Sequence, residues 1–531
     1  MNSRLLKSIS LAAILVCVSL VFSANILAAP PVDQVKVDSG QLKGEISGGV
    51  VSFKGIPYAA PPIGDLRWRA PQPVAPWSGV RSAANFGADC VQAPPGPQPF
   101  AVAPSEDCLY LNVWAPVDRT SKAMPVMVWI YGGGFVNGGT SMYSATDNGV
   151  ATVKRGVVFV TLNYRLGRFG FFAHPALTAE SPGGPLGNYG YMDQIAALKW
   201  VRRNIAAFGG DPENVTIFGE SAGGGSVLTL LTSQAAHGLF HKAIVESGGG
   251  RELLMGVRYL NKAVPQGKIS AEETGVNFAR SVGITSSGAE ALAALRKLPA
   301  DKVLAGLNMG TMGPAESTYS GPMIDGEIVR ESPKTALLAG HWAKVPVMIG
   351  ATSADIGFPK GRTFEDFWAQ FGANAAKAKA AYNPENSDNA MMVGVRIASD
   401  QMMVEPARFI ARTVAASGVP AFEFRFSYVA ETLRPHLKGA LHASEVPYVL
   451  DTVKAVYGEK LTPQDESVAQ RANAYWVNFA KTGDPNGEGL PEWPAYDAKS
   501  DVLLDFSMSG PGPVADPWKS RLDLVEALAV K

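Results

Sequence analysis

The sequence predicts an α/β fold in which a mostly parallel central sheet is covered by helices on both faces. Hydrophobic residues make up 47% of the 531 residues and charged residues only 18%, which is enough apolar material for a large core. Short apolar runs bounded by Gly, Asn or Ser alternate along the chain with segments of helical periodicity. This alternation is typical of parallel sheets whose strands are connected by helices.

The short apolar runs are interpreted as buried strands, and they lie at 126–131, 157–162, 215–218, 242–245 and 345–349. Apolar residues three and four positions apart predict a helix over 195–208 that ends at Gly209-Gly210. The stretch 251–338 is richer in helix signals, including a capping box formed by Ser270 and Glu273. We expect this stretch to be a helical insertion over the sheet.

The first 29 residues are interpreted as a signal peptide that is cleaved between residues 24 and 29. Arg4 and Lys7 precede an apolar run at 8–22, which is shorter than the ~20 residues of a membrane span. We therefore expect export to the periplasm or the medium, with a retained N-terminal anchor as the alternative. Residues 30–531 are expected to form a single domain.

The charge balance argues against two classes of partner. Lys and Arg together number 47, as do Asp and Glu, and no basic run is present. Such a chain lacks the positive footprint of proteins that bind nucleic acid or anionic membranes. We expect neither partner and no stable membrane span, and the sequence leaves the oligomeric state open.

Two cysteines remain once the signal peptide, which contains Cys17, is removed. They are Cys90 and Cys108, and an exported protein meets an oxidising compartment. One disulfide is the simplest prediction, with two buried thiols as the alternative. The enclosed segment contains five prolines, so we expect a surface loop whose two ends are joined by the disulfide.

A candidate nucleophile lies in Gly219-Glu220-Ser221-Ala222-Gly223, which matches the G-x-S-x-G pattern of a nucleophile elbow. The pattern alone is weak, but an apolar strand leads into it and a helix-compatible segment follows it. A strand, a tight turn and a helix are the elements that lift a serine hydroxyl above a sheet. A glycine-rich turn with an incidental serine is the alternative reading.

Candidate oxyanion donors follow an earlier strand, in the segment from Tyr131 through three glycines to Phe135. Successive glycines can turn their backbone N–H groups toward one point without obstruction by side chains. Together with Ala222, the N–H groups of Gly133 and Gly134 would form a hole with three donors. A flexible turn is the more common role of such a run taken by itself.

The serine also needs a base and an acid, which in hydrolases of this type follow it in the chain. The histidines after Ser221 are His237, His241, His341, His436 and His442. The strand expected at 345–349 runs into a loop with Asp355, a position typical of active-site acids in open α/β sheets. If Asp355 is the acid, only His436 and His442 follow it. A helix N-cap is the alternative role of Asp355.

Five segments of the chain resemble type-B carboxylesterases, the cholinesterase-like family of α/β-hydrolases. They are SEDCLYLNVWAP, VMVWIYGGGF, NYRLGRFGFFAHPAL, GNYGYMDQIAALKWVRRNIAAFGGDPENVTIFGESAGG and GALHASEVPYVL. The resemblance covers nearly the whole mature chain and is most specific through 187–224. It implies an α/β-hydrolase fold with the helical insertion over an active-site gorge, and hydrolysis of carboxylic esters.

The resemblance also implies roles for individual residues. The histidine of its GxxHxxExP-like segment is the catalytic base, which selects His442 and leaves His436 as a surface residue. The oxyanion positions fall on Gly133, Gly134 and Ala222. The implied pairs are a disulfide between Cys90 and Cys108 and ion pairs between Arg67 and Glu106 and between Arg165 and Asp193.

The chain departs from the family pattern in two places. The usual acid is a glutamate followed by glycine, whereas Asp355 is followed by Ile356, so its assignment rests on position. Choline-binding relatives carry a tryptophan in the loop between the two cysteines, and here that loop contains Phe100 but no tryptophan. Because a quaternary ammonium is best held over a tryptophan face, a cholinesterase is disfavoured.

The sequence thus predicts an exported serine carboxylesterase with the triad Ser221, His442 and Asp355. No metal or organic cofactor is expected, and the partner is a small ester. The candidates for substrate contacts are Tyr131, Phe135 and Glu220, which adjoin the motifs. The alternatives are a hydrolase of a specialised amide, lactone or carbamate on the same triad, and a non-catalytic binding protein of the same fold.

Overall fold

The computed structural model describes residues 32–94, 100, 102–118, 123–142, 149–265 and 267–529. The predicted signal peptide at 1–29 lies outside the described residues. Residues Val32–Lys531 form one compact unit. No helix in the described part of the chain is long and apolar enough to span a membrane.

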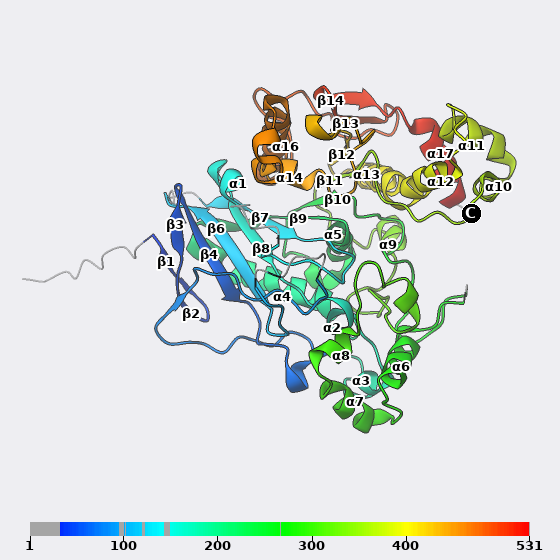
Figure 1. The fold of residues 1–531 in the computed structure, drawn as a ribbon. Coiled ribbons are helices and arrows are strands. Elements are labelled where there is room, and N and C mark those ends of the chain that lie inside the picture. Colours follow the sequence, from blue (N-terminus) through cyan, green and yellow to red (C-terminus); the bar gives the residue numbers. More distant parts are fainter. Residues whose placement is uncertain are drawn as a thin grey trace, which may run out of the picture. The chain divides into compact units, whose positions relative to one another are not determined.

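A large central sheet organises this unit (Figure 1). In spatial order its strands are β14 (Gly510–Ala515), β13 (Val502–Ser507), β12 (Ala421–Phe426), β11 (Val347–Thr352), β10 (Lys242–Glu246), β9 (Gly210–Glu220), β7 (Met124–Ile130), β8 (Val158–Leu162), β6 (Tyr110–Pro116), β4 (Val50–Pro57) and β3 (Glu45–Ser47). Every pairing from β13 to β8 is parallel, and the pairings at both edges are antiparallel. A small separate sheet contains β1 (Gln34–Val37), β2 (Gly40–Lys43) and β5 (Val80–Ser82). The mostly parallel sheet predicted from the sequence is confirmed.

The five apolar runs all become neighbouring strands, β7 to β11. Their side chains are almost entirely buried, as expected of parallel strands covered on both faces. Parallel strands place their carboxyl ends at one edge of the sheet, and this is the edge from which the candidate motifs continue.

Helices cover both faces of the sheet (Figure 1). One face carries α1 (Val150–Lys154), α14 (Val446–Val449) and α16 (Pro463–Thr482), and the other carries α4 (Tyr189–Asn204), α5 (Ala222–Thr232), α9 (Pro333–Ala339) and α13 (Glu405–Ala416). The helix predicted over 195–208 is α4 continued by a 3₁₀ turn at Ile205–Phe208. It ends as predicted, because Gly209 has φ +84° and adopts the left-handed conformation that closes helices.

The predicted insertion contains several short helices. They are α6 (Ala271–Ser281), α7 (Gly288–Arg296) and α8 (Ala300–Leu304), followed by α9. Helix α7 packs on α3 (Pro175–Glu180), and α8 packs on α2 (Gly167–Gly170). Ser270 caps α6 by accepting a hydrogen bond from the N–H of Glu273 at 3.1 Å. The reciprocal half of the predicted capping box is absent, because the Glu273 side chain is exposed to solvent and makes no bond to the Ser270 N–H.

The remaining helices lie in the C-terminal third of the chain. They are α10 (Phe364–Ala369), α11 (Ala375–Tyr382), α12 (Ala390–Ser399), α15 (Val453–Tyr457) and α17 (Lys519–Ala529). A π-helical turn at Asp400–Val404 joins α12 to α13. Arg521 of α17 forms an ion pair with Asp400 at 2.7 Å, which ties the C-terminal helix to this turn.

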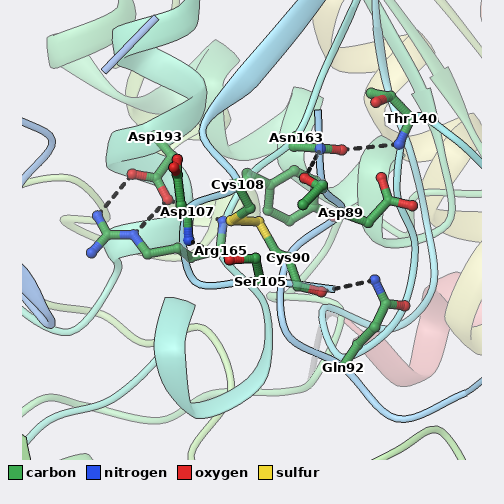
Figure 2. Close-up of a disulfide and its surroundings, with 12 residues drawn as sticks. Asp89, Cys90, Gln92, Ser105, Asp107, Cys108, Thr140, Asn163, Arg165 and Asp193 are labelled. Atoms are coloured by element: carbon green, nitrogen blue, oxygen red, sulfur yellow. Dashed lines mark hydrogen bonds and ion pairs between the residues drawn. A yellow bond between two sulfur atoms is a disulfide. The ribbon is translucent and has the colours of Figure 1, made fainter. Parts of the chain in front are cut away.

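Cys90 and Cys108 form a disulfide whose surroundings are shown in Figure 2. Both are buried, and the bridge joins positions 18 residues apart. The predicted ion pair between Arg165 and Asp193 lies beside the disulfide, with 2.7 Å between Nη2 and Oδ1 (Figure 2). The second predicted pair joins Arg67 Nη2 to Glu106 Oε1 at 2.5 Å.

Reduction of this disulfide is expected to lower the free energy of unfolding by about 3 kcal/mol, because the crosslink restricts the unfolded chain. The intact mass of non-reduced, denatured protein should be about 2 Da below the fully reduced value, with one peptide pair joined through Cys90 and Cys108. Complete alkylation of both cysteines without prior reduction would contradict this pairing.

Candidate active site

Ser221 lies at a tight turn between β9 and α5 and has the positive φ of +56°. The turn is possible because glycines flank it. A Cβ at Gly219 would lie 2.4 Å from the carbonyl oxygen of Ile130, and a Cβ at Gly223 would lie 2.0 Å from the same oxygen. Larger residues would therefore push α5 away from β7, and the strained turn aims the serine hydroxyl above the sheet edge.

The hydroxyl of Ser221 meets the imidazole of His442, with 2.8 Å between Oγ and Nε2. The other ring nitrogen, Nδ1, is 2.6 Å from Oδ1 of Asp355. An ionised carboxylate only accepts hydrogen bonds, so Nδ1 carries the proton and Nε2 is free to accept one from Ser221. These three residues, predicted from different parts of the chain, are thus joined by two successive hydrogen bonds.

Two loops bring the histidine and the aspartate together. Asp355 follows β11, and His442 lies in the connection between β12 and α14. The N–H of Ala354 donates to the carbonyl of Ala440 at 2.8 Å, and the N–H of Ala440 donates to Ser353 Oγ at 3.0 Å. These bonds pair the loops directly beside the two side chains, and they fix the distance between acid and base.

The Asp355 carboxylate is buried and fully occupied by donors. Besides His442, it accepts from Ser247 Oγ at 2.6 Å, from the N–H of Thr352 at 3.0 Å and from the N–H of Ile356 at 2.8 Å. No helix starts at this position, so the alternative role as a helix N-cap does not apply. Ser247 was not among the site residues predicted from the sequence, although its place at the carboxyl end of a predicted strand could have indicated it.

Asp355 and His442 shift each other's pKa in opposite directions. Burial alone would raise the pKa of Asp355, but the hydrogen bond and charge of His442 outweigh it and lower that pKa below its ordinary value. Burial likewise favours the neutral imidazole, yet the hydrogen bond and charge of Asp355 raise the pKa of His442 above its ordinary value. The aspartate therefore stays ionised and favours protonation of the imidazole.

The glycine run after β7 passes beside the serine. Gly133 and Gly134 have φ values of +101° and +61°, and a Cβ at Gly132 would lie 3.0 Å from Ser221 Cβ. Among the described residues, none accepts a hydrogen bond from the N–H of Gly133, Gly134 or Ala222. These donors are available to a ligand beside Ser221.

The three predicted substrate contacts occupy different environments. Tyr131 is fully buried and stacks on Tyr164 with 4.6 Å between ring centroids. Phe135 is also buried and lies edge-on to Phe171 at 5.2 Å. Neither ring has exposed surface, so contact of these two side chains with substrate stays a prediction. Glu220 Oε1 lies 3.2 Å from His442 Nε2 without an aligned hydrogen bond.

Besides Asp355, the carboxyl groups of Glu220, Glu246 and Glu445 are buried near the triad, and Glu246 is the one that was not predicted from the sequence. Burial and mutual repulsion raise the pKa of Glu220 and Glu445 well above the ordinary value. Burial also raises the pKa of Glu246 to about 8, although Trp476 donates a hydrogen bond to it at 2.8 Å. Burial thus disfavours the charged form of all three carboxyls, whereas the pKa of Asp355 is lowered, which makes Asp355 the ionised partner of His442. His436, the rejected candidate base, is exposed.

The sheet order and the position of the serine turn define an α/β-hydrolase fold. A carboxylesterase family model matches residues 31–511, so the chain belongs to the carboxylesterase family. It is 35% identical to para-nitrobenzyl esterase of Bacillus subtilis over 499 residues, covering 90% of this chain and 95% of that protein. It is 34% identical to fumonisin B1 esterase of Sphingopyxis macrogoltabida, covering 89% of this chain and 86% of that protein. A solved PNB esterase superposes with a TM-score of 0.76 at 32% identity, covering 93% of this chain and 99% of that chain.

These comparisons confirm the predicted fold, the predicted family and the assignment of the chain as a carboxylic ester hydrolase. A non-catalytic binding protein, the less favoured alternative from the sequence, is therefore excluded as the main role. The substrate of this enzyme is a small molecule.

Proposed function

We propose that Ser221 is the nucleophile of this esterase and that His442 is its general base and general acid. Asp355 orients the imidazole of His442 and stabilises its protonated form. His442 Nε2 takes the hydroxyl proton as Oγ attacks the ester carbonyl, and the tetrahedral intermediate collapses when His442 protonates the departing alkoxide. Water then attacks the acyl-enzyme by the same route and releases the acid. The observation that carries this proposal is the continuous contact from Ser221 Oγ through His442 to Asp355, at 2.8 and 2.6 Å.

The N–H groups of Gly133, Gly134 and Ala222 are proposed to stabilise the oxyanion. Negative charge develops on the carbonyl oxygen during the attack, and donors that are already oriented stabilise it without reorganisation. The unpaired state of these N–H groups in the described structure supports this role. Glu220 lies next to His442 Nε2 and is proposed to border the substrate, and burial, which raises its pKa, disfavours a second negative charge there.

Uncharged esters with short acyl or aromatic groups are the proposed substrates. Ser221 is only 6% exposed, so the reacting ester must enter a confined, largely desolvated site. Burial raises the pKa of Glu220 and Glu445 and so disfavours the charged carboxylates that would attract a cation. The names of two relatives, para-nitrobenzyl esterase and a human cocaine esterase that is 32% identical, refer to compounds with aromatic groups, which supports the aromatic part of this proposal.

The acyl-chain preference follows from this confinement. We expect kcat/KM for p-nitrophenyl butyrate to exceed that for p-nitrophenyl palmitate by at least about tenfold, because a chain that does not fit loses transition-state contacts. Initial rates with p-nitrophenyl acetate, butyrate, octanoate and palmitate below their solubility limits measure the trend. A preference for palmitate, or for a choline ester over its neutral isostere, would refute the proposed pocket.

The proposed reaction class is tested by a panel of substrates with different scissile bonds. Matched p-nitrophenyl butyrate and p-nitrobutyranilide share an acyl group, and a lactone and a carbamate complete the set. We expect the ester to be hydrolysed with the highest kcat/KM. If the anilide, lactone or carbamate is the better substrate, the physiological function is that of a specialised hydrolase on the same triad.

Export of a single mature domain that begins near residue 30 is also proposed. The apolar segment after Arg4 and Lys7 and the buried disulfide between Cys90 and Cys108 support this location. N-terminal sequencing of the protein recovered outside the cytoplasm should begin between residues 25 and 30. Recovery of the full-length chain in the cytoplasm with both thiols reduced would contradict export.

A further inference from the structure

Two methionines of the insertion lie against the proposed oxyanion loop. A Cβ at Gly134 would lie 2.5 Å from Sδ of Met309 and 3.5 Å from Sδ of Met312. Two thioether sulfurs therefore cover the side of Gly134 that a side chain would occupy in any other residue. Met309 is nevertheless 48% exposed, so solutes can approach a residue whose sulfur touches the oxyanion loop.

Hydrogen bonds link the turn that carries Met309 to the glycine run. Asn308 Oδ1 accepts from the N–H of Gly310 at 2.8 Å and from the N–H of Thr311 at 3.2 Å. The N–H of Met309 donates to Asn137 Oδ1 at 3.3 Å, and the N–H of Asn137 donates to the carbonyl of Gly133 at 3.0 Å. Asn137 thus joins the methionine turn to the oxyanion loop.

We propose that Met309 is a site of oxidative modification and that its conversion to the sulfoxide inactivates the esterase. Hydrogen peroxide oxidises the thioether by two electrons: one of its oxygens forms a bond to sulfur, the O–O bond breaks, and the other oxygen leaves as water. The product replaces an apolar sulfur beside Gly134 with a strongly polar S=O group. This inference rests on the proposed role of Gly134 as an oxyanion donor.

The sulfoxide interferes with catalysis in two ways. Its oxygen is a hydrogen-bond acceptor and competes with the developing oxyanion for the N–H of Gly134. Its partial negative charge also opposes the charge that forms on the substrate carbonyl. Weakening one preorganised oxyanion donor costs about 10²-fold in rate, so oxidation at this one residue suffices to stop most turnover.

A pair of leucine variants tests the inference. Wild type, Met309→Leu and Met391→Leu are treated with hydrogen peroxide, and hydrolysis of p-nitrophenyl butyrate is expressed as a fraction of each protein's own untreated rate. Met391 is the matched control, because it is 45% exposed but lies at the start of α12, outside the oxyanion contacts described above. Leucine is close to methionine in volume and has no sulfur to oxidise.

We expect wild type and Met391→Leu to fall below about a tenth of their starting rate once peptide mass spectrometry shows full oxidation of Met309, in line with the loss of an oxyanion donor. Met309→Leu should keep most of its own starting rate at the same dose. Methionine sulfoxide reductases should restore wild-type activity, which irreversible damage would prevent.

The inference is overturned if Met309→Leu is inactivated as fast as wild type, if wild type stays active with Met309 fully oxidised, or if Met309 resists oxidation while Met391 reacts. Failure of the proposed function has a different signature. In that case Ser221→Ala would hydrolyse the ester before any peroxide is added, whereas failure of the inference alone leaves a Ser221-dependent enzyme that survives oxidation.

Discussion

Replacing Ser221 with alanine is expected to lower kcat for p-nitrophenyl butyrate by about 10⁴-fold or more, because no other group can form the acyl-enzyme. The only change is the loss of one oxygen atom, whose hydrogen bond goes to His442 at 2.8 Å. The fold should be retained, so circular dichroism and the thermal midpoint should match those of wild type. Ester hydrolysis above a few per cent of the wild-type rate would show that another residue is the nucleophile.

A matched control is available one helical turn further along the chain. Ser226 lies in α5 and donates a hydrogen bond to the carbonyl of Ala222 at 2.9 Å, away from His442. Ser226→Ala removes the same kind of atom from the helix that follows the Ser221 turn and should keep kcat within a few-fold of wild type. A comparable loss in both variants would indicate damage to the helix in place of loss of the nucleophile.

Asp355→Asn is expected to lower kcat by orders of magnitude, about 10⁴-fold in the extreme case, because the amide cannot stabilise the imidazolium and favours the wrong tautomer. Glu445→Gln is the control. Burial and neighbouring carboxyls raise the pKa of Glu445 well above its ordinary value, so the glutamine replaces a carboxyl whose charged form is already disfavoured. A larger loss in Glu445→Gln than in Asp355→Asn would mean that the acid has been assigned wrongly.

The pH profile of Asp355→Asn separates a role through His442 from a structural role. His442 must be neutral to accept the Ser221 proton, so kcat/KM falls as the pH drops through its pKa. Asp355 raises that pKa, and its removal should move the acidic limb of the profile to lower pH. An unchanged limb with a lower plateau would indicate that Asp355 only supports the fold.

The parts of the fold that could be predicted depend on local sequence. Each central strand is a short apolar run bounded by Gly, Asn or Ser. Because a parallel strand in this sheet is buried on both faces, an uninterrupted apolar run is enough to predict it. The end of α4 was predictable for a similar reason, since Gly209 provides the left-handed closing residue. The turn at Ser221 was predictable because its tight geometry admits only glycine at 219 and 223.

The missed features depend on contacts between distant segments. Ser247 reaches Asp355 across 108 positions, and Met309 reaches the oxyanion loop across more than 170. No periodicity relates such residues, because the sheet order and the path of the insertion decide which of them meet. Asp355 combines both kinds of feature. Its position after a strand could be predicted from the sequence, but the four groups that donate hydrogen bonds to its carboxylate could not.

The capping box at Ser270 shows a limit of another kind. The sequence pattern was correct for the serine, which caps α6, because its partner is a backbone N–H that the helix always provides. The glutamate half depends on a side chain that water can equally satisfy, and Glu273 is exposed. Patterns that involve obligatory backbone groups are therefore more predictive here than those that involve optional side-chain contacts.

The central claim, that Ser221 forms the covalent intermediate, is tested most directly with diethyl p-nitrophenyl phosphate, which phosphorylates active serine nucleophiles and releases p-nitrophenolate. We predict one equivalent of p-nitrophenolate per chain, a diethylphosphoryl group on the peptide that contains Ser221, and loss of ester hydrolysis in proportion to labelling. Full inactivation with the adduct on another residue, or full labelling of Ser221 with hydrolysis retained, would contradict the account.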